Sequence, residues 1–291
     1  MSAKDIGNGY WKEKWNYAPK FIGPVSEETK NDFLIARVMN VHQVSSFIWT
    51  TFEKHIIAAA IKAGNNLLKV NGFKPMRIFD NQIIILDDEV YEKNVKMSEN
   101  EGGNCSFGYI FLRKNKDRCH FVIDIAHEIS HLFSFYSVSV KENKECRSID
   151  FYQLGFHSLS EKGNSPCFGL NEAATDLWSK VVLREMERVG AFDNLFSKEE
   201  KGRIFYEFAY ALHVHLIEEV FLNKSEKFIW PFFKSYFDGS NDFLELVKQE
   251  MPEVLRIIKN VDNTQESVVK AAYEIGGDKL RDKILQENVK K

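Results

Sequence analysis

The pentapeptide at residues 127–131, His-Glu-Ile-Ser-His, carries side chains that can hold and use a metal ion. It lies in a mainly apolar stretch that predicts a helix over about residues 119–138. On a helix, His127 and His131 are four residues apart and share one face, so both imidazoles can bind the same metal ion. Glu128 is rotated from His127 by about 100°. Its carboxylate can therefore lie beside a metal-bound water, which is the position of a general base.

A catalytic zinc site usually has three protein ligands and one open position, so a third ligand is required. Positions 134 and 137 are both serine, which rules out a third histidine in the pattern His-Glu-x-x-His-x-x-Gly-x-x-His. Glu172 opens a second helical stretch and can complete a set of two histidines and one glutamate. Asp176 lies one turn further on the same face, where it can accept a hydrogen bond from the far nitrogen of a ligand imidazole.

The motif at residues 127–131, followed by Asn-Glu-Ala-Ala-Thr-Asp at residues 171–176, resembles the glutamate zincins, the thermolysin-like zinc metallopeptidases. The resemblance covers about residues 105–190. It implies that His127, His131 and Glu172 bind one Zn²⁺ per chain. The implied activity is hydrolysis of peptide bonds, with a peptide or protein as the substrate.

The same resemblance implies roles for the remaining motif residues. Glu128 would take a proton from the zinc-activated water and return it to the leaving amine. Asp176 would support a ligand histidine, and Asn171 would lie close to bound substrate. The chain has no Gly-x-Met-Glu-Asn-like stretch, which anchors a free amino terminus in one zincin aminopeptidase family. Its absence favours an endopeptidase.

Zincins also use a tyrosine or histidine to stabilise the tetrahedral oxyanion. A helix predicted at residues 197–223 places Tyr206, Tyr210 and His213 at positions i, i+4 and i+7, as one polar-tipped stripe on an apolar helix. We expect Tyr206 or Tyr210 to have this role. The candidates behind them are His213, His157 and Tyr152. The alternative is a stripe that packs at the edge of the core.

The predicted helices that position these residues cover residues 26–69, 119–138, 170–190, 197–223, 240–258 and 263–288. The predicted strands cover residues 76–86 and 107–112. The polar stretch at 139–168 is interpreted as a packed loop that walls a cleft. We expect an α+β, zincin-like fold with a small mixed or antiparallel β-sheet, an active-site helix and a mainly helical C-terminal half.

The strand at residues 107–112 has a further possible function. In many zincins a substrate lies antiparallel to an edge strand just before the active-site helix. Residues 108–111 would form that edge here. An ordinary β-hairpin strand is the alternative.

The domain organisation follows from composition along the chain. Residues 1–25 mix glycine and proline with aromatic residues, which predicts an irregular N-terminal arm. Residues 26–291 are expected to form one unit, with an N-terminal lobe at about 26–138 and a helical C-terminal lobe at about 170–291. The alternative is a separate helical domain that begins near residue 195.

The composition excludes several classes of protein. The 291 residues contain 39 Lys+Arg and 42 Asp+Glu, so the net charge of −3 provides no basic surface for nucleic acid. No run of about 18 apolar residues predicts a membrane span. The start has no signal-like segment and the 4 cysteines form no Cys-x-x-Cys pair, so a cytoplasmic location is expected. Export by a route without such a signal is the alternative. The sequence leaves the oligomeric state open.

Two other interpretations concern the motif as a whole. The histidines could be hydrogen-bonded core residues, and Glu172 could be a carboxylate favoured by the dipole at a helix N-terminus. The chain could also be a non-catalytic regulatory or binding protein on a zincin scaffold. The intact Glu128 favours the enzyme, because a protein without activity has no need of a carboxylate at that position.

Overall fold

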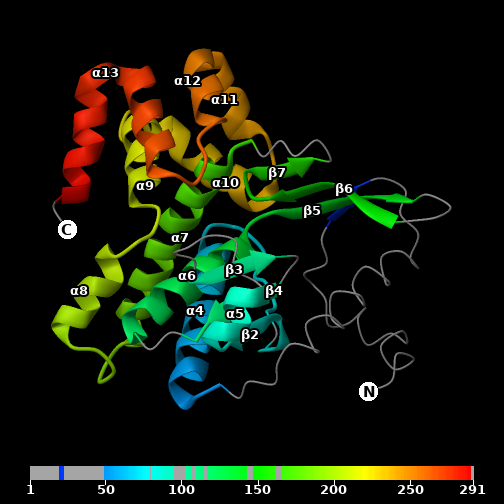
Figure 1. Ribbon diagram of the computed structural model, residues 1–291, viewed down its shortest axis with the longest axis vertical. Helices are drawn as coiled ribbons and strands as arrows, with labels where there is room; N and C mark the ends of the chain where they lie inside the picture. Colours follow the sequence, from blue (N-terminus) through cyan, green and yellow to red (C-terminus); the bar gives the residue numbers. More distant parts are fainter. Residues whose placement is uncertain are drawn as a thin grey trace.

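The computed structural model describes residues 20–22, 49–78, 80–94, 102–106, 109–114, 117–142, 147–160 and 166–289. Within these residues the fold is α+β and mainly helical, with two small β-sheets (Figure 1). Most of the predicted N-terminal arm and the first part of the helix predicted at 26–69 lie outside the described residues. None of the helices in the described part of the chain is long and apolar enough to cross a membrane.

The helical elements follow one another along most of the chain. The described α-helices are α4 (Thr51–Val70), α5 (Asp88–Asn94), α6 (Arg118–Phe133), α7 (Phe168–Arg188), α8 (Lys198–Tyr206), α9 (Ala211–Ile217), α10 (Ile229–Asp238), α11 (Asp242–Glu250), α12 (Pro252–Ile258) and α13 (Gln265–Val289). Short helical turns are η1 (Asp80–Gln82), η2 (Glu218–Leu222) and η3 (Glu226–Phe228).

The first sheet has the strand order β2-β4-β3 and packs beside α6. Its strands are β2 (Ile83–Leu86), β3 (Gly103–Ser106) and β4 (Tyr109–Arg113), with β2 parallel and β3 antiparallel to β4. The prediction that residues 108–111 form an edge is wrong, because β4 is the central strand; residue 108 lies outside the described residues. The apolar sequence of β4 suits a strand that is paired on both sides. Within the described residues the two edge strands are β2 and β3, and β3 is short and polar, as edge strands commonly are.

The second sheet has the order β1-β5-β6-β7 and contains most of the stretch predicted as a loop. Its strands are β1 (Lys20–Ile22), β5 (Tyr136–Glu142), β6 (Arg147–Leu154) and β7 (His157–Ser160). The loop prediction for residues 139–168 is therefore wrong over its described strands. Antiparallel strands with one face toward water contain many polar residues, so their composition is easily mistaken for that of a loop. The helix predicted to reach residue 138 ends at Phe133.

The C-terminal half is helical, but three of its predicted helices are interrupted. The helix predicted at 263–288 is kinked at Gly277, whose φ of 64° and ψ of −159° are not helical. The helix predicted at 197–223 ends at Tyr206 and resumes at Ala211. The helix predicted at 240–258 breaks at Met251, whose φ of −146° and ψ of 65° are not helical. Met251 precedes Pro252, and a proline disfavours helical geometry in the residue before it. Helix α10 was not predicted.

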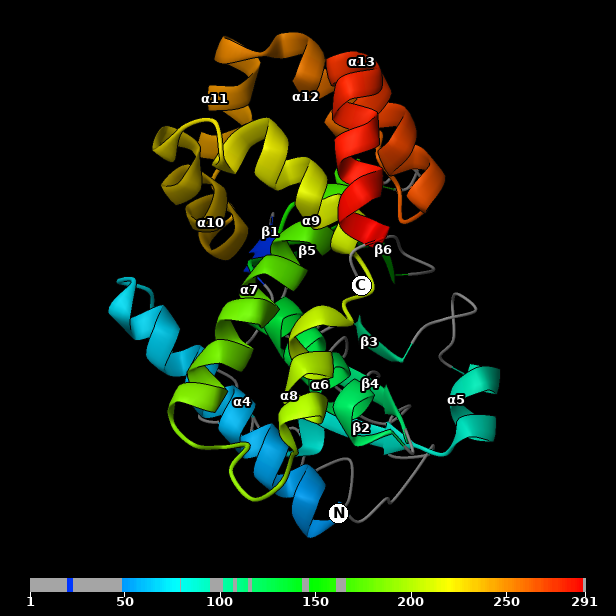
Figure 2. The same cartoon turned by 90° about the vertical axis from the view of Figure 1, so that its left-hand side faces the viewer.

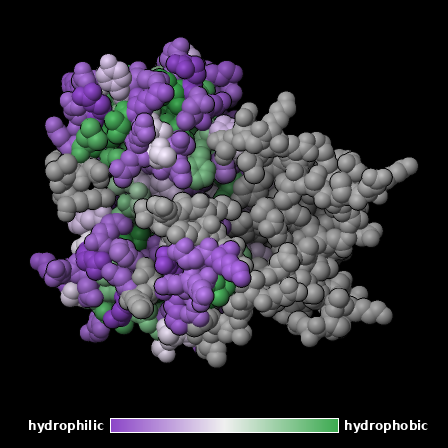
Figure 3. All heavy atoms as spheres, in the orientation of Figure 1, coloured by the Kyte–Doolittle hydropathy of each residue, from purple (hydrophilic) through white to green (hydrophobic). Residues whose placement is uncertain are grey.

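The buried apolar side chains form two clusters that meet along α7. One cluster includes α4, α6, β2, β4 and Trp178, Val182 and Leu183 of α7. The other includes α9 to α13 together with Leu170 and Ala174, at the start of α7. In Figure 2, α7 begins below α9 and runs downward among the lower elements, beside α4 and α8. On the face shown in Figure 3, hydrophilic side chains cover most of the described surface. Residues near the start of α7 therefore lie where the two clusters meet.

Candidate metal centre

Three potential ligand atoms converge between α6 and α7. The Nε2 atoms of His127 and His131 lie 3.1 Å apart. Oε2 of Glu172 lies 3.2 Å from the first Nε2 and 3.4 Å from the second. All three residues are buried, and they form a group that could hold a metal ion. The structure therefore brings together the two histidines of the first motif and the glutamate of the second.

The spacing of these atoms provides a test of metal binding. In a tetrahedral site with metal bonds of about 2.0–2.2 Å, neighbouring ligand atoms are separated by roughly 3.3–3.6 Å. The observed separations of 3.1 to 3.4 Å lie within a few tenths of an ångström of that range. Two imidazole nitrogens and one carboxylate oxygen also leave a fourth position for water or substrate. The residues present fit a small divalent metal ion.

The local sequence explains how α6 begins and ends at the site. Asp117 precedes the helix, and its Oδ1 accepts a hydrogen bond from the Cys119 N–H at 2.8 Å, a typical N-cap. Its Oδ2 accepts a hydrogen bond from Arg203 of α8 at 2.7 Å. At the other end, the hydroxyl of Ser134 donates to the carbonyl oxygen of His131 at 2.7 Å. The motif therefore occupies the last two turns of a helix held at both ends.

His127 is supported from behind by a carboxylate. Its Nδ1 lies 2.7 Å from Oδ1 of Asp176, which is only 1% exposed. Burial lowers the pKa of His127, but the hydrogen bonds with Asp176 and Glu172 outweigh burial and raise that pKa above its usual value. When His127 binds a metal through Nε2, its Nδ1–H donates to Asp176, and this hydrogen bond fixes the orientation of the ring.

Glu172 is ionised in this environment. Burial alone would raise its pKa, but the attraction of His131 and the hydrogen bonds from both histidines lower the pKa well below its usual range. Its other oxygen, Oε1, lies 3.4 Å from the side-chain nitrogen of Asn171. A carboxylate that remains charged at neutral pH is the form required of a metal ligand.

Asn171 is 1% exposed and contacts protein groups on both sides. Its Oδ1 accepts a hydrogen bond from the backbone N–H of Phe156 at 3.1 Å, and its amide nitrogen faces Glu172. The turn that presents Phe156 contains Gly155, which has a left-handed φ of 55°. A Cβ on Gly155 would lie 2.4 Å from Oδ1 of Asn171. Asn171 therefore ties Glu172 to the turn between β6 and β7.

Glu128 is 5% exposed and is outside the group of ligand atoms. It packs against the edge strand β3, because a Cβ on Gly103 would lie 2.6 Å from Cγ and 2.8 Å from Oε1 of Glu128. Cys105 follows two residues later on the same face of β3. Burial, together with the charges of Glu128 and Glu172, raises the pKa of the Cys105 thiol. Cys105 is therefore a neutral neighbour of the site.

The residues predicted to stabilise the oxyanion occupy different environments, because α8 and α9 are separate helices. Tyr206 ends α8 with 69% of its surface exposed. The Tyr210 ring stacks on the His127 ring, with centroids 5.7 Å apart and an interplanar angle of 22°. His213 is buried, and its Nε2 lies 2.7 Å from the carbonyl oxygen of Asp262. Of these three residues, Tyr210 has a direct ring contact with a potential metal ligand.

The other two residues considered for oxyanion stabilisation, Tyr152 and His157, lie on the second sheet. Tyr152 is in β6, but its side chain is outside the described part of the structure. His157 begins β7, and its ring meets that of Phe168 edge-on at 5.1 Å. Burial lowers the pKa of His157, while the charge of Glu172 opposes that shift. His157 is therefore electrostatically coupled to the ligand group.

Two contributors to the site were not predicted. Oγ1 of Thr175 lies 3.2 Å from Nδ1 of His131 and 2.8 Å from the hydroxyl of Tyr236. The second motif, Asn-Glu-x-x-x-Asp, allows any residue at position 175. The only indication of a role for Thr175 in the sequence was therefore its place on the helix, one turn after Asn171. Tyr236 comes from α10 and had none.

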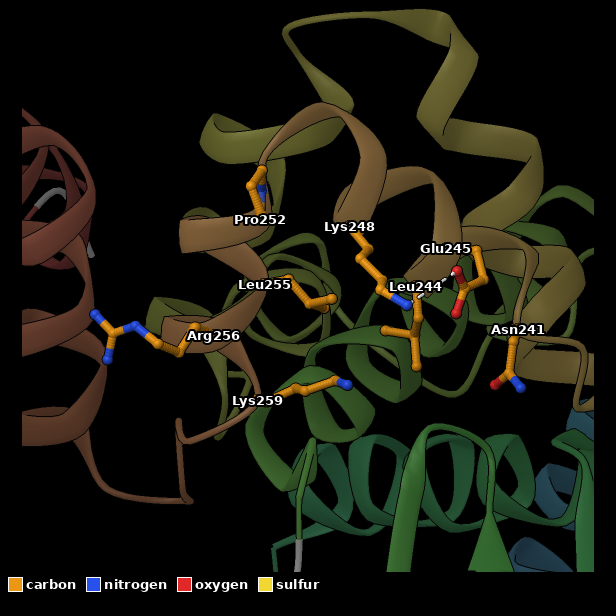
Figure 4. A pocket seen from close by; sticks show the side chains of 8 residues that line it. All are labelled: Asn241, Leu244, Glu245, Lys248, Pro252, Leu255, Arg256 and Lys259. Atoms are coloured by element: carbon orange, nitrogen blue, oxygen red, sulfur yellow. Dashed lines mark ion pairs between the residues drawn. The ribbon is translucent and has the colours of Figure 1, made fainter.

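A surface pocket of about 370 Å³ lies between α11 and α12, away from this group (Figure 4). Its lining includes Leu244 and Leu255, together with charged side chains of both signs. Lys248 and Glu245 form an ion pair across 3.6 Å. The pocket contains none of the potential metal ligands, so it does not change the location of the candidate site.

No protein-family model matches the chain, and no curated protein or solved structure matches it either.

Proposed function

We propose that the protein is a zinc-dependent metallopeptidase in which His127, His131 and Glu172 hold one Zn²⁺ and Glu128 is the general base. The observation that carries this proposal is the convergence of three buried ligand atoms from two helices at 3.1 to 3.4 Å. Two histidines and one glutamate are a common ligand set of catalytic zinc. The carboxylate of Asp176 behind His127 is the usual partner of a zinc-bound histidine.

The chemistry depends on the different roles of two buried carboxylates. A zinc ion bound here would polarise a substrate carbonyl and lower the pKa of a coordinated water toward about 7. Glu172 contributes a single negative charge, so the ligand group leaves the centre with a net positive charge. Glu128 is one residue from His127 but outside the ligand group. It can accept a proton from the attacking water and return it to the leaving amine.

The substrate proposed is a peptide in extended conformation. Strand β3 is an edge in the described part of its sheet, and an extended peptide can pair with such an edge through main-chain hydrogen bonds. Gly103 of β3 lies directly against Glu128. A peptide paired with β3 would therefore run close to the base, and main-chain pairing suits cleavage within a peptide.

A Glu128→Gln variant tests this proposal. We expect it to keep its zinc and lose about 10²–10⁴-fold in the rate of peptide hydrolysis, because the amide cannot accept the proton. Glu253→Gln, which changes an exposed glutamate of α12, is the matched control and should retain activity. Each variant is assayed with a peptide library, and its zinc content is measured in parallel.

The outcomes separate the enzyme from a non-catalytic scaffold. Undiminished hydrolysis by Glu128→Gln would overturn the role of Glu128. Zinc binding without hydrolysis of any peptide by the unmodified protein would instead favour a regulatory or binding protein that retains a metal centre.

A further inference from the structure

We propose that Thr175 is the positioning residue of His131 and that Tyr236 holds Thr175 in place. This inference rests on the proposed metal site. The Thr175 hydroxyl would accept a hydrogen bond from Nδ1–H of His131, which directs Nε2 of that ring toward the metal. Tyr236 would connect this support to α10, in the helical C-terminal half.

The two histidines have different supports. Nδ1 of His127 faces a carboxylate, Asp176, at 2.7 Å. Nδ1 of His131 faces a hydroxyl, that of Thr175, at 3.2 Å. Thr175 is fully buried, so its hydroxyl group is out of contact with bulk solvent. A hydroxyl can fix the ring without adding the second negative charge that another carboxylate would bring to the site.

A count of protons supports the direction of this hydrogen bond. For His131 to bind a metal through Nε2, its single ring proton must be on Nδ1. Besides Nδ1, the Thr175 hydroxyl oxygen lies 2.9 Å from the carbonyl oxygen of Asn171 and 2.8 Å from the Tyr236 hydroxyl. Its one proton can go to either of these, and both choices leave a lone pair for the histidine N–H.

The alternative direction conflicts with metal binding. If Thr175 donated its proton to Nδ1 of His131, the ring proton would have to be on Nε2, which could then not coordinate a metal. The metal-binding tautomer of His131 therefore requires Thr175 to act as an acceptor. Valine, which has the shape of threonine, has no acceptor for this N–H.

Tyr236 fixes the hydroxyl from the other side. It is fully buried, and its hydroxyl lies 2.8 Å from Oγ1 of Thr175 and 3.1 Å from the carbonyl oxygen of Ser130. Its own carbonyl oxygen accepts a hydrogen bond from the N–H of Phe135 at 2.8 Å. Tyr236 thus joins α10 to α6 and α7, the two helices that carry the ligand residues. The orientation of the His131 ring therefore depends on contacts among all three helices.

The experiment compares zinc affinity in four variants, by competition with a chelator on metal-free, folded protein. Thr175→Val should weaken zinc binding by about 10–100-fold, as the loss of such supports commonly does. Thr175→Ser should restore most of the affinity, since it keeps the hydroxyl. Tyr236→Phe should cause a smaller loss, because Thr175 can still accept from His131.

The matched control is Ser179→Ala, one turn further along α7. Ser179 is fully buried. Its hydroxyl group forms hydrogen bonds with Ser130 and with main-chain oxygens, and none with a histidine. Its removal should leave the zinc affinity unchanged. The absorption spectrum of the Co²⁺-substituted protein gives a second readout, which should change in Thr175→Val and not in Ser179→Ala.

The possible results distinguish this inference from the proposed function. Zinc binding by Thr175→Val that equals that of the unmodified protein would overturn the role of Thr175, while the metal site itself would stand. An equal loss in Ser179→Ala would also overturn it, because the cause would be general packing. Failure of the unmodified protein to bind zinc would overturn the metal site and this inference with it. If Thr175→Val does not fold, Thr175→Ala makes the same comparison without the added methyl group.

Discussion

Asp176 joins His127 to the break between α8 and α9. One carboxylate oxygen lies 2.7 Å from Nδ1 of His127, and the other accepts the backbone N–H of Tyr210 at 3.0 Å. In an uninterrupted helix that N–H would donate to a main-chain carbonyl oxygen of the preceding turn. The Tyr210 ring also stacks on the His127 ring. The interruption between Tyr206 and Ala211 therefore helps to position the candidate metal centre.

Asp176→Asn should weaken zinc binding by about 10–100-fold. The carboxylate accepts hydrogen bonds at both oxygens, whereas an amide can present an acceptor to His127 or to Tyr210, but not to both. Zinc affinity is measured by chelator competition. Asp193→Asn is the control, because the Asp193 side chain is 66% exposed and pairs with Lys201. Equal affinities in Asp176→Asn and the unmodified protein would show that Asp176 does not support His127.

Gly103→Ala should reduce peptide hydrolysis while the bound zinc is retained. The new Cβ would lie 2.6 Å from Cγ of Glu128, so the flexible Glu128 side chain would have to move. Gly202→Ala in α8 is the control, because nothing lies within 4 Å of its added Cβ. Hydrolysis rates and zinc content are compared in the two variants. Unchanged hydrolysis in Gly103→Ala would mean that the position of Glu128 is not critical.

Gly155→Ala should destabilise the protein more than Gly72→Ala. Both glycines have a left-handed φ, of 55° and 79° respectively, so alanine carries a similar backbone cost at both. At Gly155 the new Cβ would also lie 2.4 Å from Oδ1 of Asn171, whereas nothing lies within 4 Å at Gly72. We expect a further loss of about 1–3 kcal/mol in the free energy of unfolding. Denaturant unfolding measures this difference, and equal losses would show that the turn adapts freely.

Asp117→Asn should lower the stability of the protein at pH 7 but not in acid. The hydrogen bond from Arg203 lowers the pKa of Asp117 below its usual value. A carboxyl group with a lowered pKa stabilises the fold above its unfolded pKa of about 3.9, and this stabilisation is lost as the pH falls through the folded pKa. Asparagine keeps the helix cap but loses the charge that pairs with Arg203.

Urea unfolding at pH 7, 5 and 3 tests this dependence on pH. The difference between Asp117→Asn and the unmodified protein should be largest at neutral pH and should shrink below about pH 4. Asp80→Asn changes an exposed aspartate and should show no such trend. A difference that is constant across the three pH values would contradict the contribution of the ion pair.

The sequence predicted the elements of the site that depend on local spacing. Histidines four residues apart share a helix face, so the position of His127 relative to His131 needed only the prediction of α6. Glu172 and Asp176 are likewise four residues apart on α7. The meeting of α6 with α7 could be expected only because the combined motifs resemble those of a known family.

The elements that were missed depend on contacts between distant residues. The polar strands of the second sheet have the composition of a loop, and only their pairing makes them strands. The break after Tyr206 occurs where Asp176 takes the backbone N–H of Tyr210, which no periodicity reveals. The roles of Tyr236 and Gly103 arise because α10 and β3 pack onto the site. Two interruptions had local signals that could have been used: the proline after Met251, and the Gly-Gly pair at residues 276–277.

Zinc stoichiometry tests the central proposal most directly. The purified protein is analysed for metals beside Glu172→Ala and a control, Glu187→Ala, which changes an exposed glutamate on the same helix. We predict about one zinc ion per chain in the unmodified protein and in the control, and a sharp decrease in Glu172→Ala. Undiminished zinc in Glu172→Ala would show that Glu172 is not the third ligand. Absence of zinc from the unmodified protein, even after zinc is supplied, would contradict the account.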